Sequence, residues 1–316
     1  MSYKIGIIMP NTENGIELGA LIEDELAGLG YETDLQYADN EEQQEIWIQG
    51  LSDAGNDMLI LWALEGSDPR ETLERASYEK GVIALVTPIK DSASVVYYAG
   101  VDYYGVGYLQ AEYILQNIED LVSEEMVFFA PQARGFSPDQ VLEGLKETLE
   151  TNGVIVSEDQ ILRVENRYMA QEYMQNLLNA NGAIYKAIWC YTDEIAAGAI
   201  EAWTNLGFAP SDMPLIIGYE ATEEGLANIA AGLQSMTVKP DYEDLANAAA
   251  EAADKLMSDE PLGDLGEDYI IDGIGQEIPA YFGPWVIIDK EGEQIVEIDP
   301  ETDPETDPET DPETDP

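Results

Sequence analysis

Histidine is absent from this chain of 316 residues, and cysteine occurs once. Without histidine the chain has no serine–histidine triad, no imidazole proton relay and no histidine-based metal site. A single cysteine also excludes a cysteine-based structural zinc site. That residue, Cys190, lies in the apolar run Ala187–Tyr191, a setting typical of a small buried side chain. We therefore predict no metal and no cofactor.

Basic residues are scarce: 13 Lys and Arg stand against 65 Asp and Glu, which gives a formal net charge of −52. This balance excludes nucleic acid as a partner, because phosphates are neutralised by clustered Lys and Arg. It equally opposes docking on an anionic membrane, and self-repulsion favours a monomer. Two origins of the charge stay open: a solvated acidic surface, including one suited to high salt, and deliberate engineering.

Long hydrophobic runs are also missing, so we predict no membrane insertion. Met1–Lys4 lead straight into the first apolar run with no signal peptide before it. We expect a periplasmic or extracellular protein in its mature form, or a cytoplasmic one if the sequence is engineered.

Four short apolar runs alternate with helical patterns in the first part of the chain. The runs are Lys4–Pro10, Glu32–Ala38, Met58–Ala63 and Val82–Pro88, and the helical stretches are Gly15–Gly28, Glu41–Ala54 and Arg70–Lys80. Such alternation predicts a parallel sheet covered by helices on both faces. Ligands of such sheets bind beyond the carboxyl ends of the strands, so function is expected in the loops that follow them.

A second series of the same kind begins near Met126 and predicts a second α/β lobe. Its strands are Met126–Ala130, Gln160–Arg163, Ile184–Tyr191 and Pro214–Gly218, and its helices are Pro138–Asn152, Met169–Asn179, Glu194–Leu206 and Thr222–Ala231. A strand at Leu233–Val238, a helix at Tyr242–Met257 and a strand at Trp285–Asp289 follow. From Asp299 an Asp-Pro-Glu-Thr repeat runs to the end, and its regular proline predicts a disordered acidic tail.

Five segments carry a resemblance to a known family. They are Gly30–Asn40, Val96–Gly107 with the start of the next helix, Tyr191–Gly198, Gly232–Val238 and Val286–Lys290. In this order and spacing they resemble the sugar-binding proteins of bacterial ABC importers, in the branch that binds xylose, galactose and other aldoses. The resemblance covers about residues 3–291.

The resemblance implies an α/β, two-lobed type I periplasmic-binding-protein fold, in which each lobe is a parallel sheet flanked by helices. Three hinge crossings would join the lobes, and the ligand would lie in the cleft between them. The crossings are expected at 101–104, 238–241 and 274–281. Lobe one is then 1–102 with 241–273, lobe two is 103–240 with 274–296, and 297–316 form the tail.

No hydrolytic or nucleotide-binding motif is present, so we predict a protein that is not an enzyme. The chain has no Gly-x-Ser-x-Gly elbow and no phosphate-binding loop. Paired carboxylates carry little information in so acidic a chain.

Three acidic residues at strand ends are candidate ligand-binding groups. By the resemblance, Asp193 occupies the position whose carboxylate accepts hydrogen bonds from sugar hydroxyls. The alternative is that Asp193 caps the helix from Glu194. Glu220 stands where the family usually has Asp, with a solvated acid as its alternative, and Asp102 lies at the first crossing, where a structural role is an equal alternative.

Aromatic faces can stack on the apolar face of a pyranose ring, and three aromatic residues end predicted strands: Trp62, Tyr191 and Tyr219. Core packing is their alternative. Trp189, in the middle of its strand, is expected in the core.

The predicted site also departs from the family pattern. Its first loop is shortened to Asn11–Asn14, which leaves Asn11 as the candidate there, and the family's Asp-Arg pair after the fourth strand aligns with Val86 and Thr87. Lys90, Arg134 and Lys239 are the few cations in strand-end loops and complete the candidate set.

We therefore predict a binding protein that captures a small polar ligand, with a monosaccharide favoured, and presents it to an ABC permease. A ligand-sensing module for a membrane receptor is the first alternative. An engineered acidic scaffold without a working pocket is the second.

Overall fold

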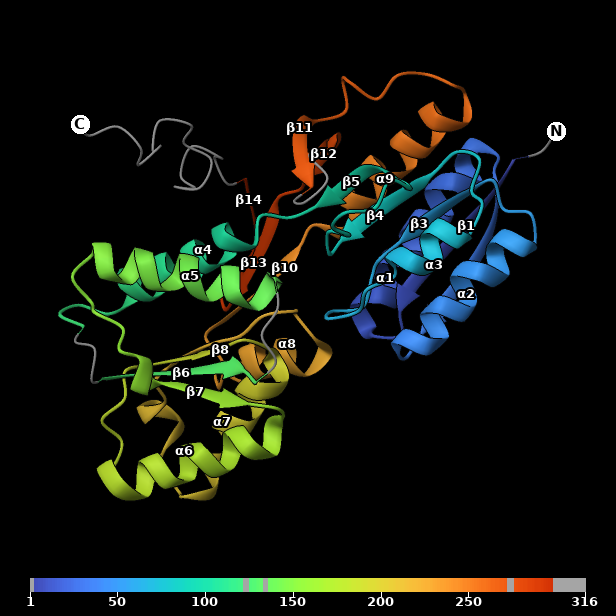
Figure 1. The fold of residues 1–316 in the computed structure, drawn as a ribbon. Helices are drawn as coiled ribbons and strands as arrows, with labels where there is room; N and C mark the ends of the chain where they lie inside the picture. The colour runs from blue at the N-terminus through green and yellow to red at the C-terminus, as the bar shows by residue number, and fades with distance from the viewer. Residues whose placement is uncertain (1–2, 122–124, 133–135, 272–275, 298–316) are drawn as a thin grey trace, which may run out of the picture. The chain divides into compact units, whose positions relative to one another are not determined.

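The computed structural model describes residues 3–121, 125–132, 136–271 and 276–297. The chain folds as two compact units and passes from one to the other three times (Figure 1). Unit 1 is Met1–Val101 with Pro240–Pro284, and unit 2 is Asp102–Lys239 with Trp285–Pro316. The predicted acidic tail lies outside the described residues, as does Arg134.

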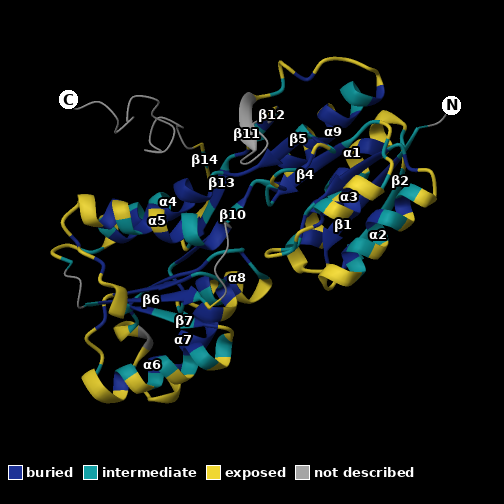
Figure 2. Ribbon diagram, viewed as in Figure 1, coloured by how far each residue is buried: buried dark blue, intermediate teal, exposed yellow. Residues whose placement is uncertain are grey.

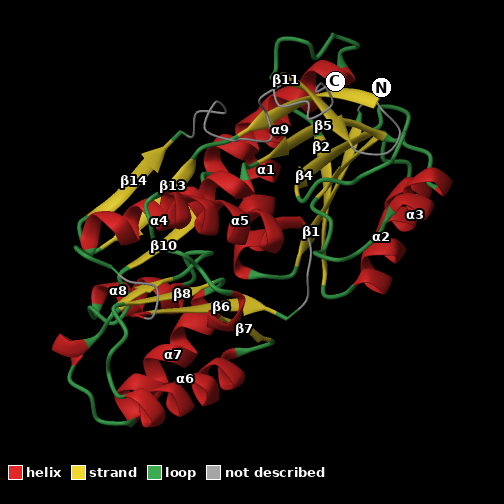
Figure 3. Cartoon of the chain, turned by 60° about the vertical axis from the view of Figure 1, so that its left-hand side comes forward, coloured by secondary structure: helices red, strands yellow, loops and turns green. Residues whose placement is uncertain are grey.

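Unit 1 contains a seven-stranded sheet in the order β11-β12-β5-β4-β3-β1-β2. The strands are β1 (Lys4–Pro10), β2 (Glu32–Ala38), β3 (Met58–Leu61), β4 (Val82–Val86), β5 (Val95–Gly100), β11 (Glu267–Ile271) and β12 (Gln276–Phe282). All neighbours pair in parallel except the edge pair β11–β12. Helices α1 (Glu13–Leu29) and α9 (Tyr242–Met257) pack together on one face (Figure 3). Helices α2 (Glu41–Asp53) and α3 (Arg70–Arg75) pack on the other (Figure 3).

Unit 2 repeats this plan with the sheet order β14-β13-β10-β9-β8-β6-β7. The strands are β6 (Met126–Pro131), β7 (Ile161–Val164), β8 (Ala187–Cys190), β9 (Leu215–Ile217), β10 (Met236–Pro240), β13 (Trp285–Asp289) and β14 (Gly292–Val296). The helices are α4 (Tyr103–Asn117), α5 (Phe136–Thr151), α6 (Arg167–Asn181), α7 (Asp193–Asn205) and α8 (Glu223–Ala230). Strands β7, β6, β8, β9 and β10 are parallel, and β13 and β14 form an antiparallel edge pair.

The central strands are buried along their whole length, which explains why they are nearly continuous apolar runs. Strands β3, β4 and β8 contain only buried residues (Figure 2). Each fully buried Leu, Ile or Phe side chain stabilises the fold by roughly 1.5–3 kcal/mol relative to an exposed one. Most acidic residues of the described helices are exposed or half-buried. A parallel sheet covered by helices, predicted from the sequence, is thus present in each unit.

Side-chain caps fix where the helices begin after the strands. The capping residues are Thr12, Asn40, Asn166, Thr192, Thr222 and Asp241, and each accepts a hydrogen bond from a backbone N–H three residues later. Each cap contributes about 1 kcal/mol. These caps hold the first turns of the helices at the edges where the parallel strands end, which are the edges expected to carry function.

The structure differs from our expectation at the third passage between units. We expected residues 274–296 in lobe two, but β12 pairs in parallel with β5 in the sheet of unit 1. The backbone hydrogen bonds of β12 therefore keep it in unit 1, and the passage falls between Pro284 and Trp285. The other two passages fall between Val101 and Asp102 and between Lys239 and Pro240.

Strands β5, β11 and β14 were not predicted, and α3 ends well before Lys80. No helix separates β4 from β5, so the strand–helix alternation that reveals the other strands fails at this point. The last two, β11 and β14, are antiparallel edge strands, and β14 is mostly exposed. An exposed edge strand lacks the continuous apolar run that identifies a buried one.

Candidate functional site

In unit 1, two candidate residues directly follow strands that end at the same edge of the sheet. Asn11 follows β1 and Trp62 follows β3, and these two strands pair in parallel. The exposed amide of Asn11 donates a hydrogen bond from Nδ2 to Oδ1 of Asp39 over 2.7 Å. Its backbone N–H donates to the carbonyl of Ala38 at the end of β2. Asn11 thus joins the ends of β1 and β2 and presents a polar surface at this edge.

Trp62 is half-buried and packs against an aromatic residue of the C-terminal part of the chain. Its ring centroid lies 6.3 Å from that of Tyr242, with the ring planes tilted by 45°. Tyr242 is the first residue of α9 and is buried. The backbone carbonyl of Trp62 accepts a hydrogen bond from Nε2 of Gln44. The indole is therefore held in place while part of its surface stays exposed.

Strand β4 ends in a strained residue that the sequence does not reveal. Val86 has a φ of 58°, a conformation that is rare for a β-branched side chain. The phenol of Tyr98 on the neighbouring strand β5 donates a hydrogen bond to the Val86 carbonyl over 2.7 Å. Such strain persists only where the surrounding structure holds it, and it is enriched at ligand sites. Lys90, the predicted cation of this loop, is exposed.

In unit 2, aromatic side chains gather where β8 and β9 end. Tyr191 and Tyr219 are half-buried, and their ring centroids lie 5.9 Å apart. The fully buried Trp285 packs against Tyr219 at 6.0 Å, with the ring planes at 60°. Trp189 contacts Tyr191 from within the core, as predicted for it. Two tyrosines thus stand on a buried aromatic base and keep part of their surface exposed.

Trp285 is a member of this aromatic cluster that the sequence analysis missed. It is the first residue of β13, far along the chain from the two tyrosines. Its Nε1 donates a hydrogen bond to the carbonyl of Asp102 over 3.2 Å. Only the topology shows that the start of β13 meets the end of β9, so no local sequence signal could have found this contact.

Asp193 is buried, with an exposed fraction of 1%, and its role as a sugar-binding carboxylate stays a prediction. Oδ1 accepts a hydrogen bond from Nε2 of Gln234 at 2.7 Å, and Oδ2 accepts from the backbone N–H of Thr222 at 2.9 Å. Burial raises the pKa of the Asp193 carboxyl above its usual value, and hydrogen bonds from Gln234, Thr222 and Thr237 oppose that rise. The Asp193 carboxylate is thus hydrogen-bonded to a residue that follows β9 and to one that precedes β10.

The alternative of Asp193 as the cap of α7 is wrong. Helix α7 begins at Asp193 itself, and the cap is the preceding residue, Thr192. The hydroxyl of Thr192 accepts a hydrogen bond from the backbone N–H of Ile195. The carboxylate of Asp193 is therefore directed to residues outside its own helix.

Glu220 lies in the loop after β9 and is half-buried. Both Glu220 and the next residue, Ala221, have positive φ angles, 98° and 52°. The Glu220 backbone N–H donates to the carbonyl of Val238 on β10 over 2.8 Å. The predicted acid thus sits in a fixed and strained turn, directly after Tyr219.

Asp102 and Lys239 lie where the chain leaves one unit for the other. Asp102 is half-buried and precedes α4, and its side chain makes no capping hydrogen bond with that helix. Lys239 is half-buried on β10. Arg134 belongs to the residues that the structure does not describe, so its candidate role stays a prediction.

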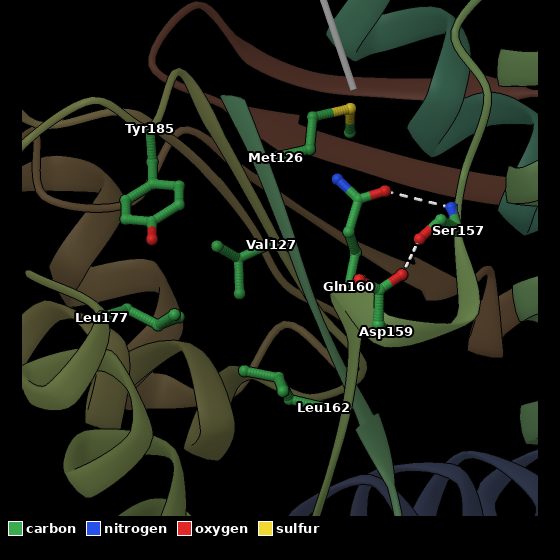
Figure 4. A pocket seen from close by; sticks show the side chains of 8 residues that line it. All are labelled: Met126, Val127, Ser157, Asp159, Gln160, Leu162, Leu177 and Tyr185. Atoms are coloured by element: carbon green, nitrogen blue, oxygen red, sulfur yellow. Dashed lines mark hydrogen bonds between the residues drawn. The ribbon is translucent and has the colours of Figure 1, made fainter. Parts of the chain in front are cut away.

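Unit 2 also has an open hollow of about 370 Å³ at the opposite edge of its sheet (Figure 4). Met126 begins β6, and Tyr185 precedes β8, so the hollow lies at the amino ends of these strands. A polar rim of Ser157, Asp159 and Gln160 faces apolar side chains across it (Figure 4). None of the predicted site residues that the structure describes lines this hollow.

Among the described residues, no group of three or more Cys, Asp or Glu side chains is placed to hold a metal ion. No helix among them has the length and apolar character needed to cross a membrane.

A family model described as a periplasmic binding protein domain matches residues 5–261. The chain belongs to this family. A similar structure is that of an ABC transporter solute binding protein from Clostridium phytofermentans with bound β-D-glucose. It has a TM-score of 0.74 and 25% identity, and the match covers 91% of this chain and 94% of that one. The predicted family and the predicted type I periplasmic-binding-protein fold are both confirmed.

Two curated relatives of this periplasmic binding protein are named for the sugars they bind. The multiple sugar-binding periplasmic receptor ChvE of Rhizobium radiobacter is 26% identical over 320 aligned residues, covering 93% of this chain and 89% of its own. The D-xylose-binding periplasmic protein of Escherichia coli (strain K12) is 30% identical over 223 residues, covering 69% of this chain and 66% of its own. Such relatives are transport receptors and not enzymes.

Proposed function

We propose that this periplasmic binding protein captures a monosaccharide and delivers it to an ABC-type importer. The family match and the sugars named for its relatives give the ligand class. The observation that carries the proposal within this chain is the pair Tyr191 and Tyr219, half-buried on an aromatic base at a carboxyl edge and followed directly by Glu220.

Each part of this surface suits one feature of a sugar. The tyrosine rings offer apolar faces on which the C–H face of a pyranose can stack. The Glu220 carboxylate can accept hydrogen bonds from hydroxyl groups, and bonds to a charged acceptor are the stronger ones. In unit 1, Asn11 and Trp62 supply the same two chemistries, an amide and an aromatic surface. We therefore propose Asn11 and Trp62 as ligand-binding residues of unit 1.

The finer assignments follow from the same reasoning. We propose an ABC permease as the partner, a periplasmic or extracellular place of action, and a monomer, since a net charge of −52 opposes self-association. Lys90, Arg134 and Lys239 remain proposed as cations that approach the ligand hydroxyls, and Asp102 as a residue at the first passage between units.

Calorimetric titration with D-glucose, D-xylose and the open-chain polyol D-mannitol tests the proposal. We expect one of the two sugars to bind and mannitol not to bind, because stacking requires the face of a ring. Tyr191→Ala should weaken that affinity about tenfold or more, as expected for removal of an aromatic anchor.

Tyr185→Ala is the matched control for that variant. Tyr185 is a buried tyrosine of the same unit that lies at the opposite edge of the sheet (Figure 4). Its loss should lower stability and leave sugar affinity within about twofold, because the deletion cost is local. Equal loss of affinity in both variants would show a general effect of destabilisation. Failure of both sugars to bind the wild type would favour a scaffold without a working sugar site.

A further inference from the structure

Two consecutive residues with side chains adopt positive φ angles in the loop after β9. They are Glu220 at 98° and Ala221 at 52°. For a non-glycine residue, such a conformation is disfavoured by a factor of the order of ten relative to its ordinary conformations. It persists only where the surrounding structure holds it. This strained pair comes directly after Tyr219. Its backbone conformation therefore sets the direction of the Tyr219 and Glu220 side chains, both proposed to bind the ligand.

The backbone of this loop is held at four successive residues, all within unit 2. The bonds are Asp193 N–H to Tyr219 O (3.0 Å), Glu220 N–H to Val238 O (2.8 Å), Ala221 N–H to Thr237 Oγ1 (3.1 Å) and Thr222 N–H to Asp193 Oδ2 (2.9 Å). Two of the four involve Asp193, one on each side of the strained pair. A single residue of α7 therefore brackets the turn.

The Asp193 carboxylate is itself fixed. Nε2 of Gln234 donates to Oδ1 over 2.7 Å, so the other oxygen is oriented toward Thr222. Glycine is required on two sides of it: a Cβ at Gly218 would lie 2.0 Å from Oδ1, and a Cβ at Gly225 would lie 2.2 Å from Oδ2. The surrounding backbone is thus built closely around this carboxylate.

We propose that Asp193 is a positioning residue that holds the strained turn at Glu220 and Ala221 and so presents Tyr219 and Glu220 to the ligand. This inference rests on the proposed function, because it treats that loop as part of a sugar site. Asp193 acts through the loop and makes no contact with the sugar. Ordinary capping does not account for these contacts, because Thr192 already caps α7.

Hydrogen exchange of the ligand-free protein tests the positioning directly. Asp193→Asn keeps the shape of the side chain but places an N–H group against either the Thr222 N–H or the Gln234 amide. We expect the peptide that contains residues 220–222 to exchange about tenfold faster, as for the loss of one buried hydrogen bond to a charged group. Asn166→Ala removes the cap of α6 in the same unit and is the control. It should leave exchange at residues 220–222 unchanged.

Rescue by glycine separates positioning from ligand contact. Glycine adopts a φ near 52° without strain, so Ala221→Gly lowers the cost of the native turn. In the Asp193→Asn background, Ala221→Gly should recover about threefold or more of the lost D-glucose or D-xylose affinity, whichever sugar binds. If Asp193 contacted the sugar, Asp193→Asn would weaken binding with unchanged exchange, and glycine would rescue nothing. That pattern would overturn the inference.

Hydrogen exchange and sugar binding together keep this inference distinct from the proposed function. If neither sugar binds the wild type, the proposed function fails, and exchange at residues 220–222 still decides whether Asp193 holds the turn. Should Asp193→Asn not fold, Thr237→Val removes the hydroxyl that accepts from the Ala221 N–H and that also hydrogen-bonds the Asp193 carboxylate. It should speed exchange at the same peptide and be rescued by Ala221→Gly. Unchanged exchange in that variant would contradict the proposal.

Discussion

At the scale of single residues, the buried carboxyl of Asp193 links stability to pH. Burial raises its pKa, so the folded state binds this proton more readily than the unfolded chain, in which the pKa is about 3.9. The stability that comes from this group is fully present below the unfolded-state pKa and is lost as pH rises through the higher folded-state pKa. Urea unfolding should therefore show the free energy of unfolding of the wild type, relative to Asp193→Asn, falling as pH rises from about 4.

The variant Asp34→Asn provides the comparison for that measurement, because the hydrogen bond from Lys4 lowers the pKa of the Asp34 carboxyl. The free energy of unfolding of the wild type, relative to this variant, should rise as pH rises to the unfolded-state pKa of about 3.9, which is the opposite sign. If the wild type and Asp193→Asn kept a constant difference across the range, the hydrogen bonds to Asp193 would fully offset its burial.

Some residues of the site follow from the sequence, and others do not. Strand ends can be read from apolar runs, so Trp62, Tyr191 and Tyr219 were placed at the carboxyl edges from sequence alone. The burial of Asp193 was not evident from the sequence, because a buried carboxylate in so acidic a chain is indistinguishable from a solvated one. Its partner Gln234 is 41 residues away. The strained Val86 was missed because its conformation contradicts its own local preference.

At the scale of elements, the contact between α4 and α5 depends on a glycine. A Cβ at Gly107 would lie 2.1 Å from the carbonyl oxygen of Val141, a backbone atom that cannot move without shifting α5. Gly107→Ala should therefore lower the free energy of unfolding by about 2 kcal/mol. Gly28→Ala makes the same chemical change in α1, where a Cβ would meet no neighbouring atom within 4 Å. This variant should raise the free energy of unfolding by roughly 0.5–1 kcal/mol. Chemical denaturation of both variants measures the change in the free energy of unfolding. A change of the same sign in both variants would contradict the packing argument.

Elements were predictable where burial and periodicity agreed. Helix α9 and strand β13 have the residue bounds predicted for them, Tyr242–Met257 and Trp285–Asp289. Strand β12 lay within a segment expected to cross between lobes, but the sequence could not say which sheet it would join. Strand β12 pairs with β5 through backbone hydrogen bonds between residues far apart in the sequence. Such bonds produce no periodic pattern of side chains in the sequence.

At the scale of the whole molecule, the net charge of −52 governs the response to salt. The described ion pairs are mostly at the surface, as between Arg167 and Glu201, and such pairs contribute about 0–1 kcal/mol each. With 65 acidic residues against 13 basic ones, we expect repulsion between carboxylates to outweigh these attractions. Screening should therefore stabilise the fold.

Raising ionic strength from about 0.01 M to about 0.15 M shortens the screening length from about 30 Å to about 8 Å. We expect the midpoint of thermal unfolding to rise by several degrees over this range, and to rise equally in NaCl and in KCl, because screening depends on ionic strength and not on the identity of the cation. A falling midpoint would mean that the surface ion pairs outweigh the repulsion. A larger rise in one of the two salts would mean that the acidic surface binds that cation, and charge screening alone would then not explain the stability of this protein.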